Sequence, residues 1–379
     1  MGGCMELDVT LPLVFGLLSL IALHLMVVRG QAPRRRTVAL FLAGLVAGTV
    51  AMGWWLAPPR YVPDASTSAL AVEMADDIRR GLRRGEAGGF VILDGGSFSA
   101  RGVDDQMLER SLAAGLDSPP TVLTLSLAGG NQLERWSVLR RAIALLTREE
   151  RERFLAAPMV LLLEIHAQYD RYPLVQLRRN RGSDRAYAYL DFPTALDALR
   201  GDDGNPGMGQ RLQQWGEVAR HVTVNLTNAG LATRIVPPDE VKGRGGYVPL
   251  ERSSGRSGFR GTRAVRQRLK QPIQMEHDLP WRNIELRRDR YARVLGSQPR
   301  IIYFSVPTLR EVDLDYARGF CAALPDYPCI THEHAKLLRS LDDAGLWFDT
   351  QHMQRGGAEI FTPWLSRRVV DVLQQEVRS

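Results

Sequence analysis

An aspartate and a histidine close to the C-terminus have the types and the spacing of an acid–base pair. Asp349 and His352 lie within the segment WFDTQHMQRGG, which begins at Trp347. One short turn can aim the aspartate carboxylate at one imidazole nitrogen and leave the other nitrogen to face a nucleophile from elsewhere in the chain. The pair therefore predicts a general base with its orienting carboxylate, and the nucleophile must be sought upstream.

A serine that follows a short apolar run is the candidate nucleophile. The run 90–94 predicts a buried strand, and Gly95, Gly96 and Ser97 follow it. Glycines let the backbone turn sharply, and a helix that starts there offers unpaired N–H groups to a developing oxyanion. Sites also collect at the carboxyl ends of strands in an open parallel sheet. We predict Ser97 as the nucleophile, with Ser99 as the alternative. Taken alone, this segment would also fit a polar turn after a strand that has no catalytic role.

The elements around these residues alternate between strands and helices. Apolar runs predict strands at 90–94, 121–127, 158–165 and 300–306. Amphipathic or capped stretches predict helices at 66–84, 103–116, 131–146, 278–295, 331–344 and 362–377. Buried strands separated by helices of this length pair in parallel. The expected fold is α/β with three layers, in which helices cover both faces of a parallel sheet.

One region interrupts the alternation. Residues 178–278 are rich in Gly, Ser and Arg and contain one helical stretch, 210–229. A long segment of this kind inside a compact domain is usually functional. We predict a loop-rich insertion between two strands that serves as a lid or a docking surface.

The two candidate blocks resemble those of the SGNH/GDSL hydrolase superfamily. In that superfamily a Gly-Asp-Ser block carries the nucleophile, and an Asp-x-x-His block near the C-terminus carries the other two triad members. Here Gly96-Ser97 and Asp349-Thr-Gln-His352 take these places, with glycine instead of the first block's aspartate. The resemblance covers residues 90–379. It implies a flavodoxin-like domain in which Ser97 is the nucleophile, His352 the base and Asp349 its orienter.

Two further blocks of the superfamily supply oxyanion donors, and this chain matches them only in part. Gly129 and Gly130 follow the second predicted strand, and either backbone N–H would serve. The usual Gly-x-Asn-Asp block after the third strand is absent, and the sequence there reads EIHAQYD. By the resemblance, Gln168 would supply a side-chain N–H in place of the asparagine. His166 would line the site, or would simply be hydrogen-bonded at the strand end. The chain is thus similar to divergent members of the superfamily.

The first sixty residues have the composition of a transmembrane helical hairpin. The apolar runs 11–28 and 38–57 are each long enough to cross a hydrocarbon core of about 30 Å as a helix, and the loop 29–36 between them carries four arginines. The positive-inside rule places this loop in the cytoplasm. Both termini and the domain 61–379 would then lie on the periplasmic side of the inner membrane. A cleaved signal peptide followed by a buried helix is the alternative, although no basic segment precedes the first run.

The cysteines and the charges restrict the chemistry further. Cys321 and Cys329 predict a local disulfide in an oxidising compartment, with two buried thiols as the alternative. His332 and His334 lack a further carboxylate or histidine at ligand spacing, so we expect no metal and no cofactor. The net charge of +7 is carried by scattered arginines without an aromatic-basic module, so we expect no nucleic-acid partner. Three arginines at 287, 288 and 290 predict a solvated basic helix face, with contact to an anionic lipid or polysaccharide as the alternative.

Membrane-anchored SGNH proteins that attach acyl groups to alginate, cellulose or lipoteichoic acid have a similar plan of anchor and outward domain. The resemblance implies a membrane-tethered serine O-acyltransferase. It would move an acetyl or similar group through an acyl-Ser97 to a hydroxyl of a cell-surface or exported polysaccharide. An integral membrane O-acyltransferase would be its donor partner. The alternatives are an extracytoplasmic carboxylesterase or lipase, and a non-catalytic SGNH-like subunit of a membrane complex.

Overall fold

The computed structural model describes residues 65–85, 88–127, 130–167, 170, 208, 212, 215–216, 247–251, 261–276, 278–296 and 299–378. The predicted membrane hairpin and most of the predicted insertion lie outside these residues. In the described part of the chain, no helix combines the length and the apolar character needed to cross a membrane. The prediction of spans at 11–28 and 38–57 stays a prediction.

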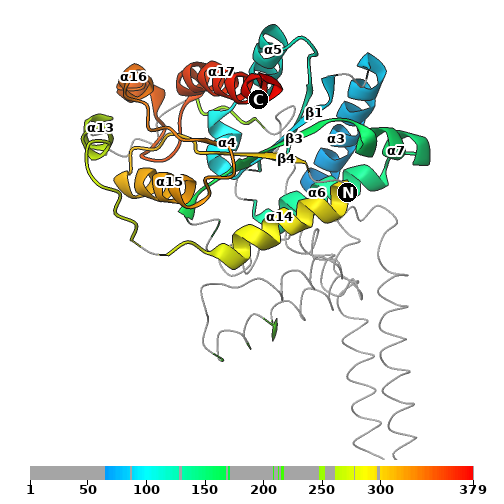
Figure 1. Cartoon of the computed structure of the whole chain (residues 1–379), viewed down its shortest axis with the longest axis horizontal. Coiled ribbons are helices and arrows are strands. Elements are labelled where there is room, and N and C mark those ends of the chain that lie inside the picture. The colour runs from blue at the N-terminus through cyan, green and yellow to red at the C-terminus, as the bar shows by residue number, and fades with distance from the viewer. Residues whose placement is uncertain are drawn as a thin grey trace, which may run out of the picture.

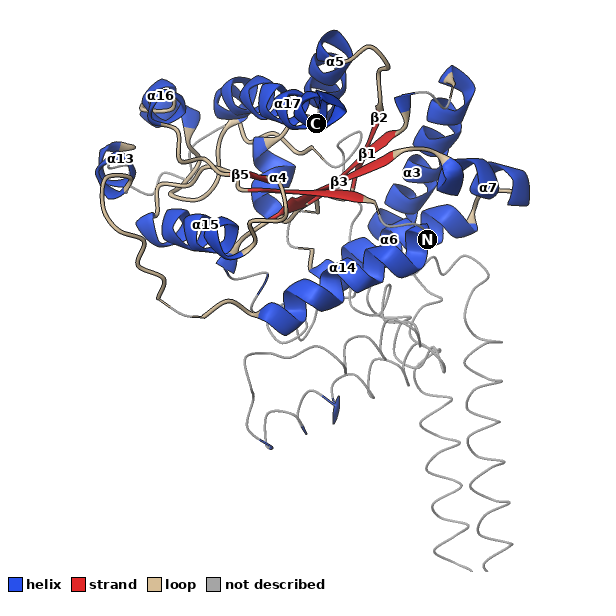
Figure 2. Ribbon diagram, in the orientation of Figure 1, coloured by secondary structure: helices blue, strands red, loops and turns tan. Residues whose placement is uncertain are grey.

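Five parallel strands form one sheet in the described part of the chain, in the order β2-β1-β3-β4-β5. The strands are β1 (Phe90–Asp94), β2 (Thr121–Thr124), β3 (Met159–Glu164), β4 (Arg300–Phe304) and β5 (Cys329–Ile330). Phe90 of β1 stands opposite Thr121 on one side and Met159 on the other. The parallel α/β fold expected from the sequence is confirmed, and this strand order is that of flavodoxin-like doubly wound sheets. Figure 2 shows the strands side by side in the centre of the domain.

Helices cover both faces of the sheet (Figure 1). On one face lie α3 (Ala65–Arg84), α6 (Gln132–Ala144), α7 (Arg148–Ala156), α14 (Trp281–Leu295) and α15 (Glu311–Ala323). On the other lie α4 (Ser97–Gly102), α5 (Asp105–Gly115), α16 (Ala335–Ser340) and α17 (Arg355–Arg378). Alternate residues of β1 supply the two cores: Phe90 and Ile92 pack on the first face, and Val91 and Leu93 on the second. A strand buried on both faces is apolar throughout, which is why β1 was recognisable in the sequence.

The structure corrects several predicted elements. β5 was not predicted, because two residues are too few to show a periodic pattern. Helix α15 was also missed; it contains Gly319, a poor helix former. The helix predicted at 331–344 shortens to α16, which begins after His334, whose side chain accepts the backbone N–H of Leu337. The closing helix begins at Arg355 instead of 362 and contains Pro363. It therefore starts directly after the turn of His352.

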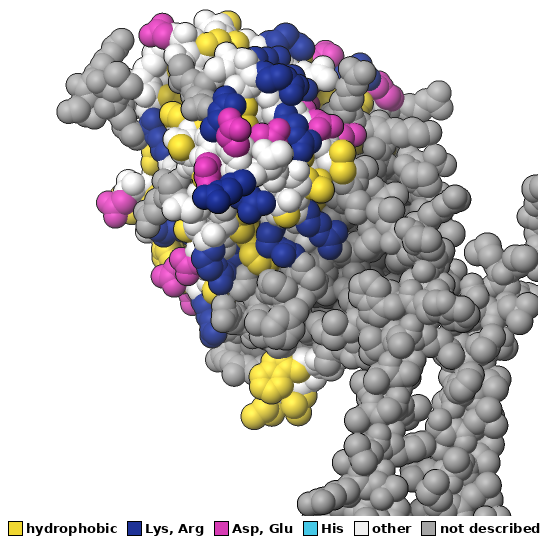
Figure 3. Space-filling model, turned by 90° about the vertical axis from the view of Figure 1, so that its right-hand side faces the viewer, with side chains coloured by type: hydrophobic (Ala, Val, Ile, Leu, Met, Phe, Trp, Pro, Cys, Tyr) yellow, Lys and Arg dark blue, Asp and Glu magenta, His cyan; other side chains and the backbone are white. Residues whose placement is uncertain are grey.

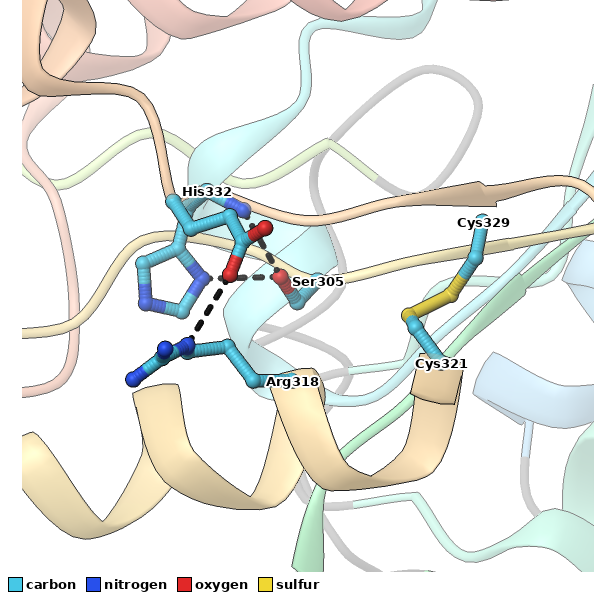
Figure 4. The surroundings of a disulfide bond; sticks show 6 residues. Ser305, Arg318, Cys321, Cys329 and His332 are labelled. Carbon is cyan, nitrogen blue, oxygen red and sulfur yellow. Dashed lines mark hydrogen bonds and ion pairs between the residues drawn. A yellow bond between two sulfur atoms is a disulfide. The ribbon is translucent and has the colours of Figure 1, made fainter. Parts of the chain in front are cut away.

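A disulfide joins Cys321, near the end of α15, to Cys329, the first residue of β5 (Figure 4). A second connection lies close to the disulfide. Arg318 Nε forms an ion pair with the Glu333 carboxylate at 3.0 Å. Both connections tie α15 to the short edge strand and to the segment that follows it.

The outer face that carries α3 and α7 has charges of both signs. Figure 3 shows arginines interspersed with acidic side chains over this face. Arg79 of α3 pairs with Asp76 and with Glu150 of α7, and Arg84 pairs with Glu109 of α5. Exposed pairs of this kind contribute little stability, and they leave no unbroken basic surface on the face in view.

Candidate active site

Ser97, His352 and Asp349 come together at the carboxyl edge of the sheet. Nε2 of His352 lies 3.0 Å from Oγ of Ser97. Nδ1 of the same ring lies 3.0 Å from each carboxylate oxygen of Asp349. With the proton on Nδ1, the ring donates to Asp349 and accepts the serine proton at Nε2. The arrangement has the connectivity and the distances of a nucleophile, a base and an orienting acid.

The position of Ser97 follows from the topology of the sheet. Strands β2 and β3 lie on opposite sides of β1, so the strand order reverses between β1 and β3. Ligands of open α/β sheets bind in the crevice at such a switch point. Ser97 begins α4 directly after β1, and it is the one residue from Phe90 to Ala100 that is not buried. The predicted nucleophile therefore reaches the surface where the fold favours a site.

Ser99, the alternative nucleophile, is directed to a different partner. Its side chain is fully buried, and its hydroxyl donates to Oε2 of Glu164 at 2.5 Å. Because the described base contacts Ser97 and not Ser99, the geometry favours Ser97 as the attacking group.

The turn that holds His352 is fixed by its own hydrogen bonds. Oδ1 of Asp349 accepts the backbone N–H groups of Gln351 at 2.7 Å and of His352 at 2.8 Å. The N–H of Phe348 donates to the His352 carbonyl at 2.8 Å. Burial would raise the pKa of Asp349, but the hydrogen bonds from His352 and Gln351 outweigh it and hold that pKa below its ordinary value. Asp349 is therefore ionised near neutral pH and can accept a hydrogen bond from the Nδ1 side of the ring.

Phe98 contacts two histidine rings beside the site. The His352 ring stacks on Phe98 with centroids 5.1 Å apart and planes 6° apart. His166 stacks on Phe98 with centroids 4.2 Å apart. Nε2 of His166 lies 3.6 Å from Asp313, and its backbone N–H donates to Asp170 at 3.0 Å. His166 and His352 thus both stack on Phe98, the residue that follows Ser97.

Gly130 is committed to a local turn in this structure. Its N–H donates to the Leu127 carbonyl at 3.0 Å, and a Cβ at this position would overlap the Leu127 side chain. Glycine is required here for packing, and the amide is already engaged instead of facing a substrate oxygen. Gly129 and Gln168, the other predicted oxyanion donors, lie outside the described residues.

A buried charge network underlies the turn of Ser97. Asp94, the last residue of β1, accepts from Arg135 Nε at 2.5 Å and from Arg287 Nη2 at 2.6 Å. Burial alone would raise the pKa of Asp94, but these two guanidinium groups lower it below its ordinary value. Arg287 also donates to the Glu164 carbonyl at 2.7 Å and to Asp170 at 3.3 Å. Replacing Asp94 would take a carboxylate away from two buried guanidinium groups, and breaking buried ion pairs in this way is strongly destabilising.

This network was not predicted from the sequence. The solvated helix face predicted for 287, 288 and 290 is wrong for two of the three, because Arg287 and Arg290 are buried. A signal was present, since β1 and β3 are apolar runs that each end in a carboxylate, Asp94 and Glu164. A buried strand that ends in an acid requires a buried partner.

A second serine–histidine contact lies near the site and is fully enclosed. Nδ1 of His332 lies 2.7 Å from Oγ of Ser305 (Figure 4). Burial lowers the pKa of His332 to about 4, a change that Asp313 opposes and His166 reinforces. The His332 ring is therefore neutral near pH 7. Among the residues that the structure describes, no three His, Cys, Asp or Glu side chains are grouped so that they could hold a metal ion.

Compared with known proteins, the chain matches no family model and no curated sequence. The geometry of the site therefore carries the functional argument.

Proposed function

We propose that this protein is a serine acyl-transfer enzyme in which Ser97, His352 and Asp349 act as the triad. The supporting observation is the continuous chain of contacts from Asp349 through the His352 ring to Oγ of Ser97, each at 3.0 Å. These contacts have the geometry that general-base activation of a serine needs. The partial exposure of Ser97 leaves the nucleophile open to a substrate.

The reaction would proceed in two halves through a covalent acyl-serine. In the first half, Oγ of Ser97 attacks the acyl carbonyl carbon while Nε2 of His352 takes the hydroxyl proton. The tetrahedral intermediate then collapses, the donor oxygen leaves, and the imidazolium returns its proton to it. In the second half, an acceptor hydroxyl gives its proton to His352 and attacks the acyl-serine, and Ser97 leaves with that proton. Asp349 stays ionised throughout and stabilises the imidazolium.

We further propose that the acceptor is a hydroxyl of a cell-surface or exported polysaccharide, and that the enzyme is anchored in the inner membrane with its domain on the periplasmic side. The resemblance to membrane-anchored SGNH proteins and the apolar runs 11–28 and 38–57 support this proposal. The disulfide supports it too, because disulfides persist in oxidising compartments. The donor would come from an integral membrane O-acyltransferase, as it does in the proteins that the chain resembles.

The test uses the purified full-length chain in detergent. We expect hydrolysis of p-nitrophenyl acetate, and covalent labelling of Ser97 by a fluorophosphonate that mass spectrometry locates. Ser97→Ala should lose both, whereas Ser99→Ala should still be labelled at Ser97. An added oligosaccharide acceptor that collects acetyl groups would support transfer, and hydrolysis alone would indicate an esterase. A folded chain that neither turns over the ester nor is labelled would contradict the proposal and favour a non-catalytic subunit.

A further inference from the structure

The structure assigns Glu164 the role of a positioning residue for the proposed reaction. We infer that its carboxylate fixes the turn that presents Ser97 and Phe98 to His352. This inference rests on the proposed function and adds to it a residue that neither the triad nor the predicted oxyanion donors include.

Glu164 holds the turn on both sides of the nucleophile. It is the last residue of β3, the strand next to β1, and it is almost fully buried. Its Oε2 accepts the N–H of Gly96 at 2.7 Å, the hydroxyl of Ser99 at 2.5 Å and the N–H of Ser99 at 3.3 Å. These donors belong to the residue before Ser97 and to the residue two positions after it. The backbone that carries Oγ is therefore fastened to one oxygen atom from both directions.

The turn at Gly95–Ser99 packs tightly against the Glu164 carboxylate. A Cβ added at Gly95 would overlap both Oγ of Ser99 and Oε2 of Glu164. Hydrogen bonds to a carboxylate are shorter and stronger than those between neutral groups, and burial strengthens them further. The backbone of Glu164 is fixed as well, because its carbonyl accepts Arg287 Nη1 at 2.7 Å. The carboxylate is therefore anchored to the sheet while its side chain holds the turn.

The same turn supplies two contacts to the base. Ser97 places its Oγ 3.0 Å from Nε2 of His352, and Phe98 stacks on the same imidazole ring. The contacts of Glu164 described above are to Gly96 and Ser99, so Glu164 acts on the position of the turn and not on the reacting atoms. A shift of the turn by about 1 Å would spoil the attack geometry, and misplacement on that scale can cost on the order of 100-fold in rate.

Three variants of the full-length chain test this role. Glu164→Ala removes all three acceptor contacts, Ser99→Ala removes the hydroxyl alone, and Glu164→Gln keeps an acceptor oxygen without the charge. Glu152→Gln, an exposed carboxylate on α7, is the matched control. For each we would measure kcat and KM on p-nitrophenyl acetate, the fluorophosphonate labelling rate, and the thermal unfolding midpoint.

We expect Glu164→Ala to lower kcat and the labelling rate by about 100-fold with KM within about twofold, because positioning acts on the attack step. Ser99→Ala and Glu164→Gln should each lose about tenfold, since each keeps part of the arrangement. The pH–rate profiles of these variants should keep the wild-type shape, which a loss of general acid–base chemistry would change. The control should behave as the wild type.

The outcomes separate this inference from the proposed function. If the wild type is active and both Glu164→Ala and Glu164→Gln are equally active, the positioning role is wrong. The proposed triad would not be affected by that result. Wild-type protein that is folded but neither hydrolyses the ester nor is labelled would overturn the proposed function and this role with it. If Glu164→Ala does not fold, Ser99→Ala and Glu164→Gln decide, and wild-type kcat in both would count against the role.

Discussion

Nε2 of His352 lies 3.0 Å from Oγ of Ser97, although 255 positions separate the two residues along the chain. The contact joins the turn after β1 to the turn before α17, and α17 packs on α4 and α5. The closing helix therefore carries the proposed base to the proposed nucleophile. Because the contact between His352 and Ser97 depends on this packing, its proposed role can be tested by substitutions that preserve the packing.

Asp349→Asn should lower kcat by about 10³-fold or more while the protein stays folded. An asparagine amide can hold the imidazole in the wrong tautomer and cannot stabilise the imidazolium, and the corresponding change in known triads costs about 10⁴-fold. Initial rates on p-nitrophenyl acetate measure the effect. Asp289→Asn, an exposed position on α14, is the control. Equal activity of Asp349→Asn and the control would remove Asp349 from the triad.

Phe98→Leu should lower kcat by about tenfold with little change in KM. The phenyl ring is buried and lies parallel to the His352 ring, so it can stabilise the imidazolium that forms during attack. A desolvated cation–π contact contributes about 2 kcal/mol. Phe320→Leu removes an equally buried ring from the opposite core and should affect stability alone. Similar kcat values for the two variants would contradict a role for Phe98 in the reaction.

The sequence revealed those parts of the fold and of the site that depend on short-range patterns. β1 and β3 are buried on both faces, so they appear as apolar runs. The spacing of Asp349 and His352 is set within a single turn, whose Oδ1 contacts are all local. Such features need no knowledge of which strands pair.

Long-range partnerships could not be derived in the same way. Asp94 and Arg287 pair across 193 positions, and nothing in the helix around Arg287 distinguishes a buried guanidinium from a solvated one. The strand order places Glu164 beside the turn of Ser97, and the hydrophobic pattern of β3 does not specify that neighbour. The edge strand β5 has two residues and depends on its pairing with β4 and on the Cys321 disulfide.

Replacing both Cys321 and Cys329 by serine should lower the free energy of unfolding by about 2–3 kcal/mol. The bridge closes a short loop, and the loss of unfolded-state entropy for a loop of this size is of that order. Urea unfolding with and without reductant measures the effect. The wild type should lose stability in reductant because both cysteines are partly exposed, whereas the double variant should be insensitive. If the free energy of unfolding of the wild type is the same with and without reductant, the prediction is wrong.

Asp105 should make the stability of the protein decrease as the pH rises towards neutrality. Burial raises its pKa from 3.8 to about 7, partly offset by a hydrogen bond from Thr124. Between these two pKa values the folded state binds a proton that the unfolded state has lost. The stabilisation is complete below about pH 4 and declines as the pH approaches 7, by up to about 1.4 kcal/mol per pH unit.

Asp105→Asn isolates this contribution. Asparagine is neutral at every pH and can still accept from Thr124, so the variant should lack this decline. Urea midpoints measured from pH 5 to pH 8 should therefore fall more steeply for the wild type than for the variant. The comparison with the variant is needed because His332 also makes stability depend on pH, in the opposite direction. Burial lowers the pKa of His332 to about 4, so this residue destabilises the folded state as the pH falls below about 6.5. Parallel curves for the two proteins would show that Asp105 does not carry a raised pKa in the folded state.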